Sequence, residues 1–173
     1  MKLLLYIILM ANSIILVDFS EPNSLSNWRI VDDVVMGGRS DGKFYTTQDG
    51  TAVFEGKVSL ENNGGFSSIR HRFPKLDLQN RNKVKIRLKG DGKVYQFRIK
   101  SQTSVYYSYV NNFKTTGEWQ DVEIILADMY PVFRGRKLNL PNFENSSIEE
   151  VAILIGNKKA ENFRLEIASI EII

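Results

Sequence analysis

The sequence predicts an all-β protein folded as an antiparallel β-sandwich. Short segments in which apolar and polar residues alternate recur along most of the chain, as in strands with one buried face. Helical periodicity is weak and is confined to two possible turns, at 22–27 and 147–150. A chain of 173 residues with 43% hydrophobic content can bury one substantial core, so its length favours a single domain.

The N-terminal segment is apolar and has two interpretations. A lysine precedes the apolar run 3–10, and residues 11–13 are small in the pattern that signal peptidases recognise. Residues 1–13 are then a signal peptide, and 14–19 form the first strand. In the alternative, they are an apolar extension of that strand in a cytoplasmic protein. We favour export, to the periplasm or the cell exterior. The run is shorter than the about 20 apolar residues that a membrane-spanning helix needs, so no integral membrane protein is expected.

Two alternating segments in the middle of the chain predict a β-hairpin. Apolar residues in 83–89 and 95–100 alternate with lysine, arginine and one glutamine, and the glycine-containing segment 90–93 joins the two. One face of this hairpin is therefore expected to be apolar and the other cationic. The cationic face is either a solvated outer surface or a binding surface for an acidic partner, and we favour the solvated surface.

Shorter patterns predict the remaining strands. Residues 122–126 alternate between apolar and polar, whereas 151–155 are apolar on both faces, as in a central strand of a covered sheet. Near the C-terminus, the apolar residues change from odd to even positions after Ile167. This change of face predicts a β-bulge near 168–169.

Two glycine-rich clusters, 33–40 and 61–70, flank an alternating strand at 54–60. Paired glycines allow positive φ or the close approach of another segment, so the clusters predict one tightly built corner. The corner could be a ligand cradle of backbone N–H groups, but no nucleophile–base pair is present, and we favour a structural role with Met36 and Phe66 in the core. The residues assigned to this structural motif are Trp28, Asp33, Met36, Gly37, Gly38, Ser40, Asn63, Gly64, Gly65, Phe66 and Ser68.

The order of these motifs resembles that of the complex I intermediate-associated protein 30 family. The resemblance rests on WRIVDDVVMGGRS at 28–40 and FEGKVSLENNGGFSSIR at 54–70. Supporting segments are 90–95, 117–119, 133–136 and 163–167. The resemblance implies a galactose-binding-like jelly roll over 14–173, an architecture shared with many carbohydrate-binding modules. Family members often have Asn-Asp-Gly where this chain has Asp-Asp-Val, so the resemblance does not fix the backbone path at Val34.

The resemblance also implies a non-catalytic, protein-binding module, similar to assembly factors or chaperones of respiratory complex I. The alternative on the same fold is a carbohydrate-binding module. The chain contains no cysteine, which excludes thiol nucleophiles and thiolate metal sites. Its single histidine, His71, lies on an apolar strand face, so we expect no enzyme. Three carboxylates could contribute calcium ligands but lack the spacing of a calcium-binding loop, and we predict no metal and no cofactor. These carboxylates are Asp18, Glu21 and Glu171.

Aromatic residues near the centre of the chain offer one candidate for ligand stacking. Tyr107 and Tyr109 share a strand face with Phe113, which is a core pattern, whereas Tyr106 points the other way. Tyr106 could therefore stack on a sugar, and Arg98 could donate hydrogen bonds to sugar hydroxyls.

Other candidate binding residues are arginines. Arg134 and Arg136 surround a glycine in an expected loop after Pro131, and together with Arg70 they are the first place to look for a partner surface. The net charge of +3 and a pI near 9.0 permit an acidic partner but fall short of a nucleic-acid-binding signature. We therefore expect a protein partner, with a glycan as the alternative, and no nucleic acid.

Overall fold

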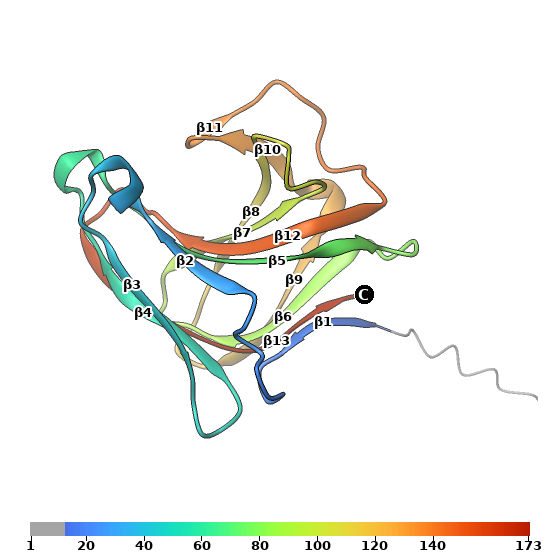
Figure 1. The fold of residues 1–173 in the computed structure, drawn as a ribbon, viewed down its shortest axis with the longest axis horizontal. Helices are drawn as coiled ribbons and strands as arrows, with labels where there is room; N and C mark the ends of the chain where they lie inside the picture. The colour runs from blue at the N-terminus through green and yellow to red at the C-terminus, as the bar shows by residue number, and fades with distance from the viewer. Residues whose placement is uncertain (1–12) are drawn as a thin grey trace, which may run out of the picture.

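The computed structural model describes residues 13–173, apart from the side chains of Val35 and Met36, and has two antiparallel sheets packed face to face (Figure 1). The first sheet has the order β3 (Asp41–Thr46), β4 (Ala52–Val58), β13 (Glu161–Ile172), β6 (Lys83–Lys89) and β9 (Trp119–Ile125), and β1 (Ile14–Asp18) also pairs with β13. The second sheet has the order β11 (Arg136–Lys137), β10 (Tyr130–Phe133), β8 (Ser108–Lys114), β7 (Val94–Lys100), β12 (Ser147–Ile155), β5 (Ser67–Asp77) and β2 (Trp28–Asp32). The predicted all-β, antiparallel sandwich is confirmed.

The predicted hairpin of 83–89 and 95–100 is wrong. Both segments are strands, but β6 belongs to the first sheet and β7 to the second, so 90–93 crosses from one sheet to the other. Thr115, which follows β8, takes part in this crossing. A Cβ atom on Gly90 would lie 2.2 Å from the Cβ of Thr115, and the Thr115 hydroxyl accepts a hydrogen bond from the Gly92 N–H at 3.1 Å. Alternation in both strands is as expected, because each keeps its apolar residues inside the sandwich.

Two other strand predictions are confirmed and one turn prediction is wrong. β12 lies in the middle of its sheet between β7 and β5, and residues 151–155 are all buried. β13 changes register between Ile167 and Ser169, at the predicted bulge. Residues 147–150 are not a turn but the start of β12, whereas 22–27 do form turns.

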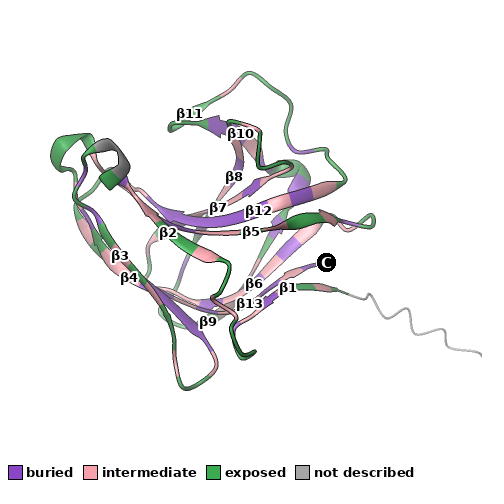
Figure 2. Ribbon diagram, in the orientation of Figure 1, coloured by how far each residue is buried: buried purple, intermediate pink, exposed green. Residues whose placement is uncertain are grey.

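The space between the two sheets is filled by apolar side chains from both inner faces, which appear purple in Figure 2. Phe54 and Leu165 come from the first sheet, Phe97 and Ile153 from the second, and all four are fully buried. Trp28 packs near one edge, where its ring stacks on His71 at 5.0 Å and lies 5.3 Å from Phe44 of the opposite sheet. Burial of this apolar surface supplies the main stabilisation of the fold.

The two glycine-rich clusters form one corner, held together by the buried carboxylate of Asp33. That carboxylate accepts hydrogen bonds from the Ser40 N–H and hydroxyl, at 2.9 and 2.5 Å, within the first cluster. It also accepts the Gly65 N–H at 2.6 Å and the Phe66 N–H at 3.2 Å in the second cluster. Two short 3₁₀ turns, η1 (Asp33–Met36) and η2 (Glu61–Asn63), lie side by side there (Figure 1).

The corner's glycines are needed because the backbone approaches Asp33 closely. A Cβ atom on Gly38 or Gly64 would lie 2.3 or 2.6 Å from a carboxylate oxygen of Asp33. Gly37 ends η1 in the left-handed conformation, with φ of +88°. Ser68 anchors the neighbouring strands, since its hydroxyl donates to the Val31 carbonyl at 2.7 Å. Val34, where relatives often have glycine, is accommodated in η1 without a positive φ.

The predicted N-terminal signal or extension lies outside the described residues, apart from Ser13. The predicted core position of Met36 also concerns a side chain outside the described part. None of the helices in the described part has the length and apolar character needed to span a bilayer.

Candidate ligand-binding pocket

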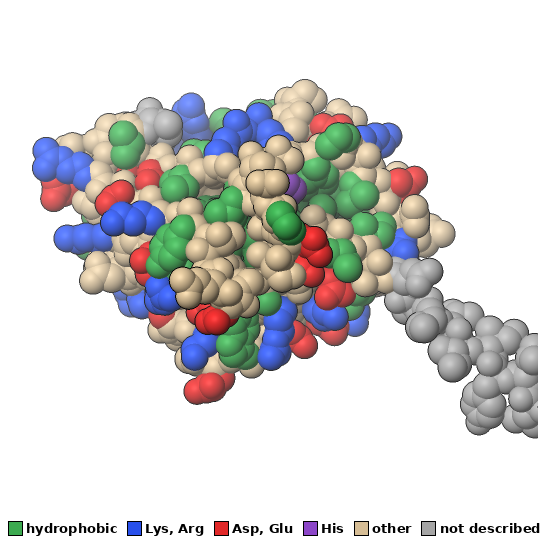
Figure 3. All heavy atoms as spheres, turned by 60° about the horizontal axis from the view of Figure 1, so that its bottom comes forward, with side chains coloured by type: hydrophobic (Ala, Val, Ile, Leu, Met, Phe, Trp, Pro, Cys, Tyr) green, Lys and Arg blue, Asp and Glu red, His purple; other side chains and the backbone are tan. Residues whose placement is uncertain are grey.

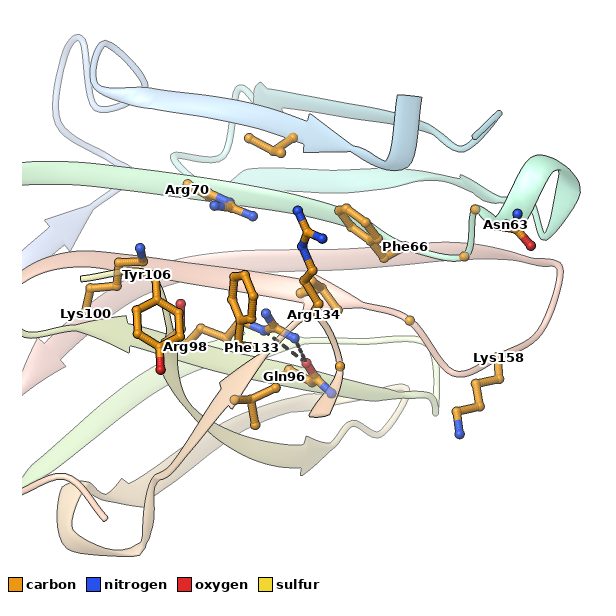
Figure 4. A pocket seen from close by; sticks show the side chains of 18 residues that line it. Asn63, Phe66, Arg70, Gln96, Arg98, Lys100, Tyr106, Phe133, Arg134 and Lys158 are labelled. Atoms are coloured by element: carbon orange, nitrogen blue, oxygen red, sulfur yellow. Dashed lines mark hydrogen bonds between the residues drawn. The ribbon is translucent and has the colours of Figure 1, made fainter. Parts of the chain in front are cut away.

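A pocket of about 520 Å³ lies on the outer face of the second sheet, within the range that small-molecule sites usually occupy. The sheet is curved: its β8, β10 and β11 end bends up over the outer side of β7 and β12 (Figure 1), so this outer face is concave. Alternate residues of β7 line the pocket, the corner residues 63–66 lie at one side, and the β10–β11 turn lies at another (Figure 4).

Four of the five predicted binding residues line this pocket, although they come from separate parts of the chain. Arg70 lies on β5, Arg98 on β7, Tyr106 in the segment before β8, and Arg134 in the turn after β10. Tyr106 is 62% exposed, and its ring lies edge-on to that of Phe133 at 5.1 Å. Arg136 is outside the pocket, on the exposed strand β11.

The segment containing Arg134 is a hairpin, not the loop expected after Pro131. Phe133 pairs with Arg136, and the two residues between them both have positive φ, +47° for Arg134 and +76° for Gly135. This is the backbone pattern of a type I′ turn, which suits the twist of paired strands. The guanidinium of Arg134 lies 5.3 Å from the Phe133 ring centre and reaches back over the sheet (Figure 4).

The predicted core position of Phe66 is wrong, because this side chain is half-buried and lines the pocket. Residues 68 and 70 lie on the outer side of β5, and residue 66, just before the strand, lies on the same side, whereas Ile69 faces the core. Strand alternation extended back from Arg70 would have identified this placement. Phe133 and Lys158 also line the pocket without having been singled out in the sequence.

The other aromatic candidates do not reach the pocket. Tyr109 and Phe113 are each 6% exposed and pack in the core, as their shared face predicted. Tyr107 packs edge-on against Tyr109, with ring centres 5.4 Å apart. Trp119 lies on β9 of the opposite sheet, under the guanidinium of Arg87.

The cationic residues of β6 and β7 lie in different electrostatic surroundings. On the outer face of the first sheet, Lys83, Lys85 and Arg87 pair with carboxylates of β9 and β13 at 3.0 to 3.4 Å. Figure 3 shows basic and acidic side chains interspersed on the molecular face that includes this sheet. Among the described residues that line the pocket, five are Lys or Arg and none is Asp or Glu. The pocket therefore has a local positive charge that the net charge of +3 does not reveal.

Burial perturbs the two arginines at the pocket floor. Burial, together with the nearby positive charge of Arg70, lowers the pKa of Arg98 to about 10. Burial also lowers the pKa of Arg70, against the attraction of the Glu150 carboxylate. Both side chains carry charge at neutral pH, and a buried charge is stabilised by an anionic partner.

The N–H groups of the corner's paired glycines are already used within the corner and do not form a ligand cradle; those of Gly37, Gly38 and Gly64 donate to backbone carbonyls. Those of Gly65 and Phe66 donate to Asp33, so the corner contributes shape to the pocket edge and not free donors. His71 faces the core side of β5 beside Trp28, and burial lowers the pKa of its imidazole. Within residues 13–173, no cluster of three or more His, Asp or Glu side chains is arranged to hold a metal ion.

Solved structures with a similar fold include carbohydrate-binding modules. One is a family 11 module from Clostridium thermocellum solved with a β-1,3-1,4-mixed-linked tetrasaccharide, with a TM-score of 0.68 and 17% identity over 93% of this chain and 95% of that one. Another is the family 11 module of the cellulosomal cellulase Lic26A-Cel5E of the same organism, with a TM-score of 0.67 and 16% identity over 93% and 94% of the two chains. At these identities the likeness concerns the fold, which is the galactose-binding-like jelly roll.

A family assignment comes from the sequence itself. Residues 17–167 match the sequence pattern of the complex I intermediate-associated protein 30 family. This range includes the glycine corner and all five predicted binding residues. Because the match covers well over half of the chain, this protein belongs to the complex I intermediate-associated protein 30 family.

Proposed function

We propose that this protein is a non-catalytic binding module that holds a carbohydrate in the concave pocket of its second sheet. The observation that carries the proposal is the pocket's combination of exposed aromatic rings with converging guanidinium groups. Tyr106 and Phe133 offer ring surface, while Arg70 and Arg98 offer several N–H donors each. A concave site of this volume suits a small ligand better than the broad surface that a stable protein–protein interface buries.

The family 11 module solved with a tetrasaccharide supports the proposal at the level of the fold. The site chemistry supports it independently, since pyranose rings present C–H faces that pack on tyrosine and phenylalanine, and their hydroxyls accept from arginine and glutamine. Gln96 lies beside Arg98 on β7 and accepts its N–H groups at 2.6 and 3.0 Å, which orients both side chains in the pocket.

Affinity electrophoresis through a panel of polysaccharides, followed by calorimetry on the best ligand, tests this function. Shallow sugar sites typically give micromolar to millimolar dissociation constants, on the order of −4 to −8 kcal/mol. Tyr106→Ala is expected to weaken binding at least about tenfold, because it removes the exposed ring. Trp119→Ala removes an exposed aromatic ring from the opposite sheet and is expected to leave binding unchanged. The proposal fails if no glycan is retained, or if both variants bind like the parent.

Family membership favours a second candidate function, the holding of a protein partner during assembly of a larger complex. The exposed β10–β11 hairpin is the natural contact point, because Arg134 and Arg136 both lie there. Affinity purification of a tagged copy under native conditions, with and without Arg134→Glu and Arg136→Glu, tests it. A stoichiometric partner lost with these variants supports the assembly function, whereas recovery of no specific protein contradicts it.

Non-catalysis has its own test at His71. This imidazole is directed away from the pocket and packs against Trp28, so His71→Ala is expected to lower stability without abolishing any turnover. A reaction that disappears in a folded His71→Ala variant would overturn the proposal. Export, which we also propose, is checked by mass spectrometry of the mature N-terminus, with cleavage expected after Ser13.

A further inference from the structure

Two neighbouring rows of residues run across β5, β12 and β7 on the outer face of the second sheet. In the first row, Glu150 of β12 lies opposite Arg72 of β5 on one side and opposite Lys100 of β7 on the other, in the register of the strands. In the second row, two residues further along β12, Ala152 is paired with Arg70 and Arg98 in the same way. The rows therefore share one pattern, with a cation on each flank, and differ in the central residue.

The first row contains its own anion. Glu150 is 2% exposed, and one of its carboxylate oxygens accepts the Nε–H of Arg72 at 2.5 Å. The same carboxylate favours the charged forms of Arg70 and Lys100, and Lys100 also donates to the Val105 carbonyl at 2.5 Å. The buried carboxylate thus offsets one of the two positive charges in this row, and proteins usually accommodate a buried charge by such pairing.

The second row has a methyl group where the first has a carboxylate. Ala152 is 4% exposed, and no carboxylate of the described residues forms an ion pair with Arg70 or Arg98. The hydrogen bonds of Arg98 go to the neutral amide oxygen of Gln96. Arg29 on β2 lies opposite Arg70 in the register of the two strands and adds a further positive charge to this row. Like charges gathered at a partly buried site are costly unless an anion joins them.

The register sets the geometry of this pair. Adjacent strands lie about 4.8 Å apart, so the backbones at Arg70 and Arg98 are roughly 10 Å apart, with Ala152 midway. Arginine side chains are long enough to converge over the small alanine, and each guanidinium can donate two parallel hydrogen bonds to a carboxylate. Figure 4 shows both guanidiniums directed into the pocket, with the Arg134 guanidinium reaching toward the side where Arg70 lies.

We infer that the Arg70–Ala152–Arg98 row binds the carboxylate of an acidic sugar, a uronate, in the position that Glu150 occupies in the neighbouring row. This inference rests on the proposed carbohydrate binding and specifies its ligand class. A uronate carries its carboxylate directly on the pyranose ring, so the ring can pack on Tyr106 while the carboxylate reaches the arginines beside it. Arg134 and Lys158 extend the positive charge along the pocket and suit a polymer with a carboxylate on each residue.

Isothermal titration calorimetry with an oligogalacturonate and with its methyl ester tests the inference. The two ligands share a sugar backbone, and only the first carries charge. We expect the acid to bind at least about tenfold more tightly than the ester, and Arg70→Gln or Arg98→Gln to reduce this ratio to near one. Arg87→Gln is the matched control, because it removes an arginine that already pairs with Asp121 on the opposite sheet at 3.4 Å.

The substitution Ala152→Glu gives a second test that does not remove a cation. The new carboxylate would lie between Arg70 and Arg98, as Glu150 lies between Arg72 and Lys100. This variant is therefore expected to lose the preference for the acid and to melt at or above the temperature of the parent protein. A variant that folds and still prefers the acid would contradict the position assigned to the ligand carboxylate. If Ala152→Glu does not fold, the Arg98→Gln result decides.

The outcomes separate this inference from the proposed function. Equal binding of acid and ester, lost in Tyr106→Ala, would overturn the uronate inference and leave carbohydrate binding intact. Failure of both ligands and of all neutral glycans would overturn both. Binding of a poly-glutamate peptide in place of any glycan, with the same dependence on Arg98, would also overturn the uronate assignment and would favour an acidic protein partner.

Discussion

Asp33 connects two segments that lie more than 20 residues apart in the sequence. Its buried carboxylate accepts four hydrogen bonds, two from Ser40 and two from the backbone of Gly65 and Phe66. Burial alone would raise the pKa of this carboxyl, but the hydrogen bonds from Ser40, Gly65 and Phe66 together outweigh burial and lower it. A carboxyl with a lowered folded-state pKa stabilises the fold where it is ionised.

We therefore expect Asp33→Ala to lose on the order of 3 kcal/mol at pH 7, because three backbone N–H groups and the Ser40 hydroxyl would lose their acceptor. The contribution is fully present above the ordinary carboxyl pKa near 4 and disappears as pH falls through the lower folded-state value. Urea unfolding of parent and variant at pH 7 and at about pH 3 measures the effect, and the difference should shrink at low pH. An equal difference at both pH values would show that packing, not charge, is lost.

Gly65 tests the corner in a different way. Its φ is +139°, a conformation that side chains with a Cβ rarely adopt, and a Cβ there would lie 3.3 Å from Leu60. We expect Gly65→Val to cost about 1–3 kcal/mol, visible as a lower melting temperature. Gly117→Val is the control, because no atom lies within 4 Å of its added Cβ and its φ is not positive. If Gly65→Val melts like the parent but binds no ligand, the corner acts as a binding element.

At the level of strands, the sequence predicted which segments are strands and which side of each is buried, but it did not predict which strands pair with one another. Alternation in β6 and β7 identified both strands and their buried sides, because alternation reports only which face is apolar. The segment 90–93 is as compatible with a crossing between sheets as with a tight hairpin. The contact that distinguishes them involves Thr115, which is more than 20 residues away in sequence. Such long-range contacts leave no local pattern.

The pocket could be predicted as a set of residue types but not as an arrangement. The sequence identifies four pocket residues one at a time, because alternation or turn chemistry places each of these polar or aromatic residues away from the core. They are Arg70, Arg98, Tyr106 and Arg134. The equivalence of Ala152 and Glu150 depends on the register of three strands, two of which are distant in sequence. An alanine in a buried strand has no feature that marks it as the centre of a site.

The β10–β11 hairpin provides a matched pair of arginines. Arg134 at its tip lines the pocket, whereas Arg136 two residues later lies outside it. We expect Arg134→Ala and Arg136→Ala each to change stability by less than about 0.5 kcal/mol, as exposed substitutions usually do. Only Arg134→Ala should weaken glycan binding in calorimetry, since only Arg134 adds charge to the pocket. Equal losses in both variants would instead identify the hairpin surface as the contact.

Across the whole molecule, the sandwich separates two cationic surfaces whose lysines and arginines come from consecutive strands, β6 and β7. Lys83, Lys85 and Arg87 of β6 pair with carboxylates of β9 and β13, whereas the cations of β7 line a pocket without acidic lining residues in the described chain. The crossing at 90–93 produces this separation, because it sends one strand to each sheet. The fold thereby converts a modest net charge into a local positive potential on one face.

This separation predicts how affinity for an acidic ligand depends on salt. Lys83→Gln and Arg98→Gln each lower the formal net charge from +3 to +2, but on opposite faces of the molecule. The two sheets are about 10 Å apart, and the Debye length is about 8 Å at physiological ionic strength, so the charge of Lys83 is screened from the pocket. Calorimetry with oligogalacturonate near 0.15 M salt should therefore show less than about a twofold change for Lys83→Gln and at least tenfold weakening for Arg98→Gln. At about 0.01 M salt, where the Debye length is roughly 30 Å, Lys83→Gln should begin to slow association. If both variants weaken binding equally near 0.15 M salt, the ligand responds to the total charge of the protein, and the pocket is not its binding site.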